Sequence, residues 1–516
     1  MRFCALQFTV TIVVLLVAVP TVEAQSMSPR YYKIGTPVLV ELWVDPQNGN
    51  DSNGGSTRAD AVRSLTEAWS RIPSGTSLTG HGYRILLVRG DHTDVPVYWE
   101  SRYGTHEYPI LIQAADGKGT AGLPALNIFD CRYLYLIGLN IHSDGGDVFH
   151  CERCDHLLIR KSKISGSDPE SFAVQETLKI NQSRYIYVER SDISGGWDNA
   201  VDLVAVQYGH FQKNKIHNAG DWCMYLKGGS AYFRVEANEY YDCGTGGFTA
   251  GQGTGFEFME TPWLHYEAYD IKFINNVIHH TFGAGMGVNG GYNILMAYNT
   301  LYRIGMNSHV FESVFGARGC DGNTSECRLR LNAGGWGTTK RNNGSNEEPI
   351  PDRNVFVYNN IFYNPDGVKS QWQHFAVPGP QRPSSGSNIP SPSRTDDNLQ
   401  IRGNVIWNGP RNHPLGIEGS DAGCQNSNQA CNERQLFNEN SINTVEPELV
   451  NPERRLFRPV PGGNLFGVTT YDIPAFAGGD RPQPPLSPDG VPGNSVARDR
   501  RGKKRSASAP PGAYRD

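Results

Sequence analysis

A set of polar residues recurs at a similar place in successive short apolar segments of this chain. They are Lys179, Asp202, Lys227, His265 and Asn289, each preceded by an apolar residue and each followed 10 to 12 residues later by a small polar residue. Because side chains alternate across a strand, the apolar neighbours face a core and the polar residues face outward. If the segments stack, these residues form a column whose members lie close enough to shift one another's pKa.

Lys227 has the surroundings expected of a binding site. It lies in GDWCMYLKGGS, where two glycines leave room for a ligand beside the lysine. Trp222 and Tyr225 in the same segment are suited to stacking on sugar rings. Desolvation and nearby positive charge bring the pKa of a lysine toward neutrality, where it acts as a general base. We therefore interpret Lys227 and His265 as catalytic candidates, and Lys179 and Asn289 as substrate-binding candidates.

The elements that must position these residues form a repeat. Short apolar segments such as FQKNKI (211–216), VEANEY (235–240) and FINNVI (273–278) share one polar anchor position. The anchors Ser191, Asn214 and Asn238 are spaced 23 and 24 residues apart, and Asn276 and Asn299 are spaced 23 apart. This period, without helical periodicity between the segments, predicts an all-β solenoid whose strands stack at about 4.8 Å. Asparagine at one position predicts an internal ladder of amides.

The chain divides around this repeat. We expect a signal peptide over 1–25, an N-terminal cap with a short helix over 31–125, and the solenoid over 126–410. C-terminal turns and a cap follow over 411–479, and a disordered, Pro-rich basic tail over 480–516. The anchor spacing widens to 38 residues after Asn238 and to 61 after Asn299, which predicts two long insertions that form a binding wall.

Composition and cysteine usage indicate an exported protein. A net charge of -5 with only 19% charged residues argues against a nucleic-acid binder. Beyond the leader there is no apolar run long enough to span a membrane, so we expect a secreted monomer. Nine cysteines follow the leader, and the short loops Cys320–Cys327 and Cys424–Cys431 suit local disulfides, whereas the partners of Cys131, Cys151, Cys154, Cys223 and Cys243 stay open. Glycosylation sequons begin at Asn50, Asn181, Asn323 and Asn343.

The repeat region, roughly 125–410, resembles the right-handed parallel β-helix proteins that include polysaccharide lyases and pectin-active enzymes. NAGDWCMYLKGG followed by VEANEYYDCGTGGF is similar to a lyase pattern in which a lysine beside glycines precedes an Asn-rich turn and a Gly-rich turn. The resemblance implies a single-stranded right-handed parallel β-helix, Lys227 as the base, and Ca²⁺ held by Asp198, Asp202 and Asp221. The paired aspartates and Gly-His-Gly motif expected of β-helix pectin hydrolases are missing, which favours a lyase.

The function expected from these residues is β-elimination of a uronic-acid-containing glycan. The reaction removes the proton at C5, next to the carboxylate, and expels the sugar at O4. Because the charged carboxylate makes that proton weakly acidic, a cation must neutralise it: Ca²⁺, or an arginine such as Arg234 or Arg303. Two alternatives remain open: a non-catalytic extracellular-matrix or glycan-binding protein, and a C5 epimerase, which begins with the same proton abstraction.

Overall fold

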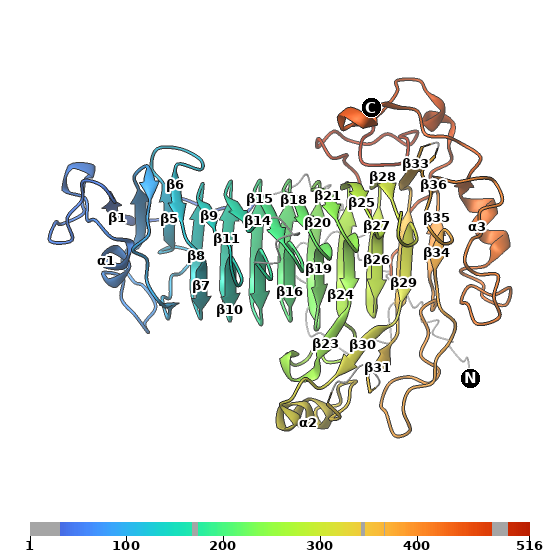
Figure 1. Ribbon diagram of the computed structural model, residues 1–516, viewed down its shortest axis with the longest axis horizontal. Coiled ribbons are helices and arrows are strands. Elements are labelled where there is room, and N and C mark those ends of the chain that lie inside the picture. Colours follow the sequence, from blue (N-terminus) through green and yellow to red (C-terminus); the bar gives the residue numbers. More distant parts are fainter. Residues whose placement is uncertain (1–30, 168–173, 342–345, 366, 477–493) are drawn as a thin grey trace, which may run out of the picture.

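The chain winds into an elongated solenoid in which three parallel sheets run the length of the molecule (Figure 1). The structure is a computed structural model, and it describes residues 31–167, 174–341, 346–365, 367–476 and 494–516. The expected signal peptide and the sequon at Asn343 lie outside the described residues. Each of the central turns contributes one strand to each sheet, which confirms the predicted parallel β-helix.

The sheets are named here in the order in which the chain meets them in one turn. Sheet 1 holds β4 (Trp99–Glu100), β7 (Leu126–Phe129), β10 (Phe149–Glu152), β13 (Leu178–Asn181), β16 (Val201–Val204), β19 (Trp222–Lys227), β22 (Gly246–Gly251), β26 (Ala284–Asn289), β29 (Phe311–Val314) and β34 (Phe375–Ala376). Sheet 2 holds β1 (Leu39–Val44), β2 (Gly82–Leu87), β5 (Ile110–Ala114), β8 (Arg132–Ile137), β11 (Asp155–Arg160), β14 (Arg184–Glu189), β17 (Gln207–Gln212), β20 (Ser230–Glu236), β24 (Ala268–Ile274), β27 (Gly291–Ala297), β32 (Arg353–Tyr358) and β35 (Gln400–Arg402). Sheet 3 holds β3 (Gly90–Asp91), β6 (Ala121–Leu123), β9 (Asn140–His142), β12 (Lys163–Ser165), β15 (Asp192–Gly196), β18 (Lys215–Ala219), β21 (Glu239–Cys243), β25 (Val277–Thr281), β28 (Thr300–Ile304), β33 (Ile361–Asn364), β36 (Val405–Asn408) and β37 (Ser441–Ile442).

The core fills the space enclosed by the three sheets. Leu178, Val201, Met224, Phe248 and Met286 pair in successive strands of sheet 1, and all five are fully buried. Each turn alone would leave its inward face in water. Stacking buries this face against the next turn and stabilises the fold by roughly 1.5–3 kcal/mol for each large apolar side chain. The residues that alternate with this column, such as Lys179 and Asp202, point away from the core.

The anchor asparagines form the predicted ladder at the corner between sheets 2 and 3. The backbone N–H and side-chain Nδ2 of Asn214 donate to Oδ1 of Asn238 at 2.9 and 3.0 Å. Asn238 donates in the same way to Asn276, and Asn276 to Asn299. Each amide is fully buried and satisfied, so the ladder fixes the corner at every turn with a net contribution of about 1 kcal/mol per bond.

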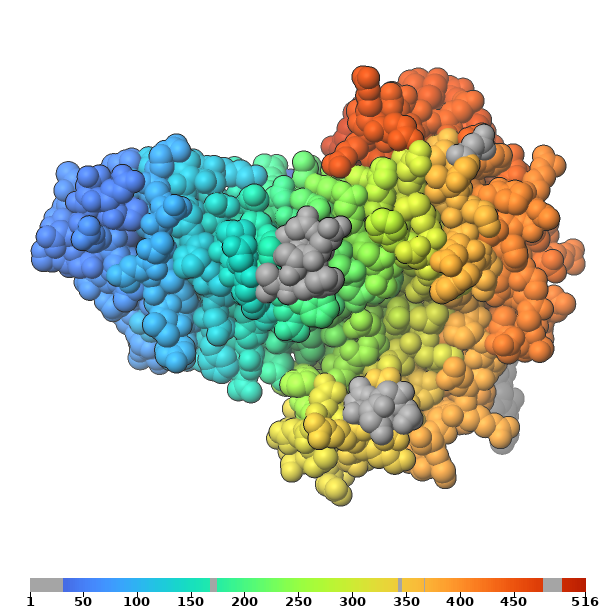
Figure 2. Space-filling model, viewed as in Figure 1, coloured from blue at the N-terminus to red at the C-terminus, as the bar shows by residue number. Residues whose placement is uncertain are grey.

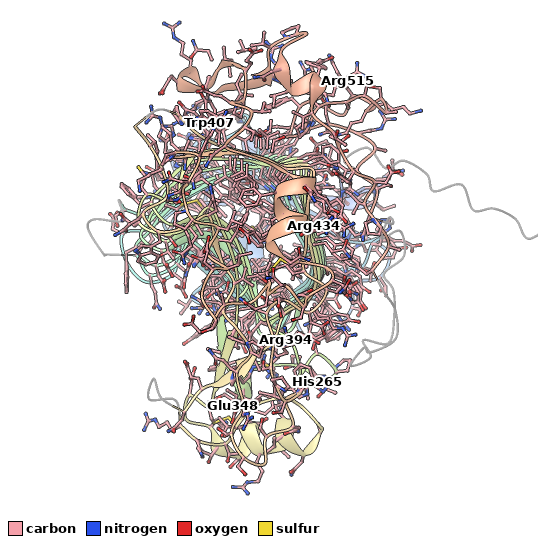
Figure 3. The ribbon with its side chains drawn as sticks, turned by 90° about the vertical axis from the view of Figure 1, so that its right-hand side faces the viewer. His265, Glu348, Arg394, Trp407, Arg434 and Arg515 are labelled. Atoms are coloured by element: carbon pink, nitrogen blue, oxygen red, sulfur yellow. A yellow bond between two sulfur atoms is a disulfide. The ribbon has the colours of Figure 1, made fainter. Side chains whose placement is uncertain are left out.

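Short helices close the two ends of the solenoid. At the N-terminal end, α1 (Leu65–Ser70) buries Leu65 and Trp69. Ser64 caps this helix by accepting the N–H of Glu67 at 3.0 Å. At the other end α3 (Glu433–Glu439) lies across the last turn and buries Leu436 (Figure 3). The remaining short elements are the 3-10 turns η1 (Arg58–Asp60), η4 (Pro452–Arg454) and η5 (Asn464–Gly467) and the strands β38 (Leu449–Asn451) and β39 (Leu456–Pro459).

The C-terminal residues correct the expectation of a disordered tail. Residues 477–493 lie outside the described part, but 494–516 pack back onto the solenoid. Arg500 donates to the carbonyl of Asn238, and Arg505 donates to Asn275 at 2.8 Å and covers the ring of Tyr298. Ala513 is fully buried. The basic residues bind carbonyl and amide oxygens along the asparagine corner, so they are part of the fold.

Both predicted insertions join in one projecting wall below the solenoid (Figures 1 and 2). The first supplies β23 (Gly253–Gly255) and η3 (Phe256–Phe258), and the second supplies β30 (Gly316–Gly319), α2 (Thr324–Asn332) and β31 (Glu348–Ile350). The strand β30 pairs with β23 in parallel and with β31 in antiparallel fashion. The second insertion thus forms an antiparallel pair of its own, and the first insertion adds the third strand of this small sheet.

The described residues form four disulfides. The two expected local bridges, Cys320–Cys327 and Cys424–Cys431, are present, together with Cys151–Cys154 and Cys223–Cys243, which joins β19 to β21. Cys131 is a buried thiol, and burial raises its pKa to about 12. No helix in the described residues is both long enough and apolar enough to cross a bilayer.

Candidate functional site

The register of sheet 1 corrects the predicted polar column. Lys179 pairs with Asp202 as expected, but Asp202 pairs with Tyr225, and Lys227 lies opposite Val204. One residue of this two-residue shift arises at the corner after β19, where the chain needs one residue more than in the preceding turn to reach sheet 2; the other arises because Lys227 lies 11 residues before its anchor and Asp202 lies 12 before its own. Lys227 still faces outward, because it is two residues beyond Tyr225, but it belongs to the neighbouring row.

His265 is not part of this face. It lies in the wall, where its ring packs edge-on against Trp336 and its Nε2 contacts the carbonyl of Gly334 at 3.1 Å (Figure 3). Burial lowers the pKa of His265 to about 4. The proposed pairing of Lys227 with His265 is therefore wrong: the residue counted back from the Asn276 anchor falls in an insertion, and no strand holds it at that position.

Lys179, Asp202 and Lys227 nevertheless line one cavity of about 370 Å³, which is called the lysine cavity below. Its floor comes from the outward residues of sheet 1, including Asn181, and its side comes from the wall segment 253–255, Phe258 and Asp321. The lysines are on strands two turns apart, so only the stacked fold brings them together. The cavity is open to solvent on one side, as a site for a polymer requires.

The two lysines have different partners. Lys179 Nζ lies 3.7 Å from Asp202 Oδ2. Burial disfavours the charged form of Lys179, but attraction to Asp202 and neighbouring carboxylates outweighs it and raises its pKa above the usual value. Lys227 Nζ instead donates to the amide oxygen of Gln252 at 3.0 Å and lies 4.4 Å from the ring centre of Tyr225. Lys179 is thus a cation held beside a carboxylate. Among the described residues, no carboxylate oxygen lies within 4.0 Å of Lys227 Nζ, whose partner is an amide oxygen.

Carboxylates gather beside the lysine cavity. Burial, together with repulsion from Asp202 and Asp198, raises the pKa of Glu176 to about 10. Burial and Asp202 raise the pKa of Asp198, and burial also raises that of Asp221. Glu176 was not identified from the sequence, because it lies in a turn without the repeat pattern. The available signal was its position 23 residues before Asn199, whose backbone N–H it accepts at 3.1 Å.

This cluster has the donor chemistry that a hard divalent cation prefers. All its ligand atoms are carboxylate oxygens, and Asp202 Oδ1 is buried without a hydrogen-bond partner among the described residues. In the described part of the chain no three of these carboxylates converge within 4.8 Å, so their side chains would have to close around an ion. Glu176, Asp198 and Asp202 are the residues best placed to hold one, while Asp221 lies nearer to the turn of Thr245.

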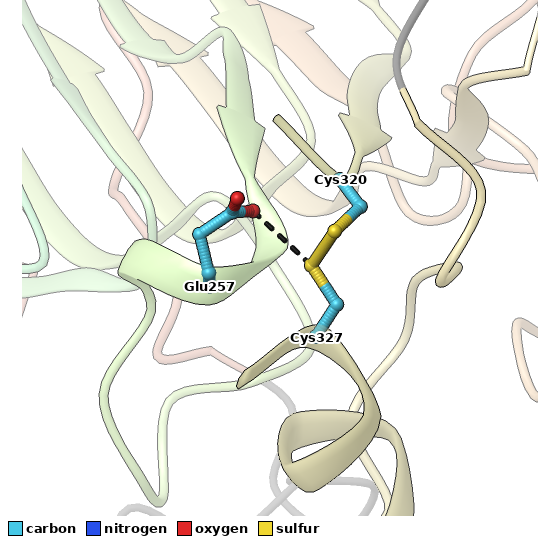
Figure 4. Close-up of side chains that lie close together, drawn as sticks. All are labelled: Glu257, Cys320 and Cys327. Carbon is cyan, nitrogen blue, oxygen red and sulfur yellow. Dashed lines mark hydrogen bonds between the residues drawn. A yellow bond between two sulfur atoms is a disulfide. The ribbon is translucent and has the colours of Figure 1, made fainter. Parts of the chain in front are cut away.

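A second group of potential ligands lies in the wall and is not a metal site. Glu257, Cys320 and Cys327 converge within 4.8 Å, but both sulfurs belong to one disulfide (Figure 4). Glu257 instead accepts the backbone N–H groups of Asp321 and Asn323 at 3.0 and 2.9 Å. This carboxylate and the disulfide together hold the loop that presents Asp321 to the lysine cavity.

A fully buried ion pair ties the wall to the lysine. Glu267 and Arg318 are both inaccessible to solvent, and Arg318 Nε donates to Glu267 Oε1 at 2.9 Å. Glu267 Oε2 accepts the backbone N–H of Gly228 at 2.8 Å and the hydroxyl of Thr254 at 2.7 Å. Gly228 follows Lys227 directly, and Thr254 lines the lysine cavity. One carboxylate therefore fixes both sides of the cavity.

The paired glycines serve this contact, contrary to the expectation that they clear space for a ligand. Gly228 and Gly229 both have positive φ, at 65° and 83°. A Cβ on Gly229 would lie 2.3 Å from the carbonyl of Trp263 in the wall, and one on Gly228 would crowd Thr254. Glycine is needed at this corner because the wall packs directly against the backbone.

The other predicted site residues lie elsewhere or are covered. Arg234 faces outward from sheet 2 and pairs with Glu236, and Arg303 is on sheet 3 and pairs with Glu453. Trp222 and Tyr225 are buried in the floor, so they offer no face to a sugar. Asn289 accepts the Thr249 hydroxyl at 2.7 Å outside the lysine cavity. The arginines were misplaced because residue type alone does not say which sheet a side chain leaves from.

The sequons have different settings. Asn181 lines the lysine cavity and contacts His150, whereas Asn323 caps α2 by accepting the N–H of Glu326. Asn50 accepts the N–H and hydroxyl of Ser52 at the surface near the N-terminal end. A glycan on Asn181 would compete with any ligand of the cavity.

One family model and several solved structures are similar to this chain. A family model for the right handed beta helix region matches residues 124–262. No curated protein matches the chain. Pectate lyase Pel9A is 14% identical with a TM-score of 0.42, over 93% of this chain and 96% of that chain. A rhamnogalacturonan lyase is 12% identical with a TM-score of 0.40, over 70% and 87% of the two chains. The A-module of the Azotobacter vinelandii mannuronan C-5 epimerase AlgE6 is 12% identical with a TM-score of 0.37, over 66% and 89%.

Proposed function

We propose that this right-handed parallel β-helix is an extracellular polysaccharide lyase that cleaves a uronic-acid-containing glycan by β-elimination. The observation that carries the proposal is the pair of lysines in one open cavity, one held among carboxylates and the other bonded to an amide. A site for elimination next to a carboxylate needs these two roles: a fixed cation and a separate base. The disulfides fit an oxidising, extracellular setting.

Lys227 is the base in this mechanism. Lys227 takes the proton from C5 of the uronate, the C4–C5 double bond forms, and the bond from C4 to the leaving oxygen breaks. The leaving oxygen takes a proton from water. Lys179 stays an ammonium and offsets the carboxylate charge, which makes the C5 proton more acidic. A divalent cation bound by Glu176, Asp198 and Asp202 would add to this neutralisation.

The wall gives the site its shape. Thr254 and Asp321 face the floor across the lysine cavity, and the Glu267–Arg318 pair keeps Gly228 and Thr254 at a fixed separation. Holding the lysine and the sugar in a near-attack geometry accounts for a large share of the barrier reduction in enzymes. The wall residues therefore position the substrate, while Lys227 and Lys179 on the floor of the cavity take part in the reaction.

The proposal is tested by following the ultraviolet absorbance of the unsaturated product with a panel of uronate polymers, with and without chelator. Lys227→Ala should lower the rate about 10²–10⁴-fold, as expected for loss of a general base, and leave binding in place. Lys215→Ala is the matched control, because Lys215 is an exposed lysine on sheet 3. Full turnover in Lys227→Ala would remove the assignment of the base.

The same experiment separates the alternatives. A C5 epimerase would leave the absorbance unchanged but exchange the C5 hydrogen with solvent deuterium, which proton NMR of the recovered polymer detects. A glycan-binding protein without activity would give neither signal but would still be retained on a column of the polymer. Lyase activity without any effect of Lys179→Ala would show that another cation neutralises the carboxylate.

A further inference from the structure

A second cavity lies around the corner from the lysine cavity, where the chain passes from sheet 1 to sheet 2. Its volume is about 550 Å³. Its lining includes the rings of Tyr185, Tyr208 and Trp263 and the guanidinium groups of Arg132, Arg153 and Arg184. This corner cavity is used by no step of the proposed elimination.

The aromatic side of the corner cavity is rigid. Five rings stack along the solenoid axis, from Tyr133 through His156, Tyr185 and Tyr208 to Tyr232, with centroid separations of 4.1, 4.4, 5.1 and 5.1 Å. All five residues have positive φ, between 49° and 65°. Non-glycine residues adopt this conformation at a cost, which the stacking of each ring on the next offsets. The corner is therefore a fixed edge that does not need a ligand to order it.

The arginines of the corner cavity are held in place yet open to solvent. Arg184 Nε donates to Asp155 at 2.7 Å, and the Arg184 side chain is 63% exposed. Arg153 lies 3.7 Å from Glu152 and is 61% exposed. Each pair uses one nitrogen of the guanidinium group, which leaves terminal N–H groups able to bind a carboxylate in the two-pronged manner that arginine favours.

The two cavities adjoin over Gln182, which lines both. Its Nε2 donates to Glu260 Oε1 at 3.0 Å and to the carbonyl of Phe258 at 3.3 Å. Phe258 lines the lysine cavity and Glu260 lines the corner cavity. Gln182 thus bridges the solenoid and the wall where the two cavities meet, and a linear chain that occupies both cavities must pass around this hydrogen-bonded contact or displace it.

We propose that the corner cavity is a distal subsite for an acidic glycan, in which Arg184 and Arg153 bind carboxylates of the chain whose reacting sugar lies at Lys227. This proposal rests on the proposed function for the identity of the bound glycan. It implies that the substrate is a polymer rather than a disaccharide.

The test measures binding of uronate oligomers of increasing length by calorimetry, in the Lys227→Ala background so that nothing is cleaved. Arg153→Gln combined with Arg184→Gln should weaken binding of long oligomers about tenfold or more, the loss expected for charge-assisted hydrogen bonds, and leave disaccharide binding unchanged. Arg58→Gln is the control, because Arg58 is also exposed and paired with one carboxylate, Asp116, far from both cavities. Matching thermal unfolding of the variants excludes a folding defect.

The outcomes separate this subsite from the proposed function. Arginine-dependent binding of long oligomers by a protein that cleaves none of them would keep the subsite and overturn the lyase. Cleavage whose length dependence ignores the two arginines would keep the lyase and overturn the subsite. Equal binding of uncharged oligomers of the same length would overturn the assignment of an acidic ligand, and absence of binding to any oligomer by the parent chain would overturn both.

Discussion

The Glu267–Arg318 pair makes the most direct prediction about how the wall is attached. Arg318→Met leaves the carboxylate of Glu267 buried without its counter-ion, and Glu267→Gln leaves the guanidinium in the same position. Removing one partner of a buried pair costs about 3–5 kcal/mol of stability, because the remaining charge is uncompensated. Both groups are fully inaccessible, so solvent does not screen this cost.

The double variant should behave differently from the sum of the single ones. Glu267→Gln with Arg318→Met removes both charges, while the glutamine oxygen can still accept the N–H of Gly228 and the hydroxyl of Thr254. Replacing a buried pair by neutral groups of similar size is often close to neutral, so we expect the double variant to lose less stability than either single variant.

Denaturant unfolding of the four proteins measures this coupling, and hydrogen exchange at Gly228 and Thr254 locates it. The single variants should speed exchange at these two residues and in β30 while leaving the N-terminal turns unchanged. Additive losses in the double variant, or exchange that rises equally along the solenoid, would refute the idea that this pair specifically joins the wall to the lysine strand.

Three further predictions follow from the site. Because Glu176 has a folded-state pKa of about 10 against an ordinary 4.5, its contribution to stability is present below pH 4.5 and is lost as the pH rises toward 10. In chelator, Glu176→Gln should therefore unfold at a higher temperature than the parent chain at alkaline pH, and an equal pH dependence of the two melting temperatures would contradict this. Removing the Cys320–Cys327 disulfide by serine substitution should cost about 2 kcal/mol and loosen the wall in hydrogen exchange, whereas removing Cys424–Cys431, of the same loop length, should leave the wall unchanged. Peptide mass spectrometry of the chain from a eukaryotic secretory host should find Asn181 without a glycan, since its amide contacts His150 inside the lysine cavity; an occupied site would argue against a ligand there.

The solenoid was predictable because its repeat is imposed by hydrogen bonding. Asn214 and Asn238 must each satisfy the same buried donors and acceptors one turn apart, so the same residue type recurs at the same spacing. The local segment GDWCMYLKGGS singled out Lys227, which lines the lysine cavity. What the sequence could not supply was the row in which Lys227 lies, since the spacing of 24 residues between Asn214 and Asn238 shows that this turn has one residue more than the preceding turn but not at which corner.

The rest of the site depends on contacts between segments with no shared pattern. Glu267 and Arg318 are 51 residues apart in two different insertions, and nothing in either segment indicates that they meet. The same holds for Arg153 and Arg184, which lie on successive turns but outside the anchor motif. Arg234, by contrast, looked suitable as an exposed cation near Lys227 in sequence, yet it leaves from sheet 2, because seven residues are enough for the chain to turn a corner.

The departures from the repeat fall together at one place in the fold. The extra residue after Lys227, the two glycines with positive φ, the first insertion and the buried Glu267–Arg318 pair all lie within a few turns of β19. A solenoid built only for stability would keep its period here, because each irregularity costs backbone strain or buried charge. Sequences satisfy local rules except where function requires otherwise. The concentration of irregularities around Lys227, and the regular ladder on the opposite corner, therefore argue that selection on this chain acts at the lysine cavity.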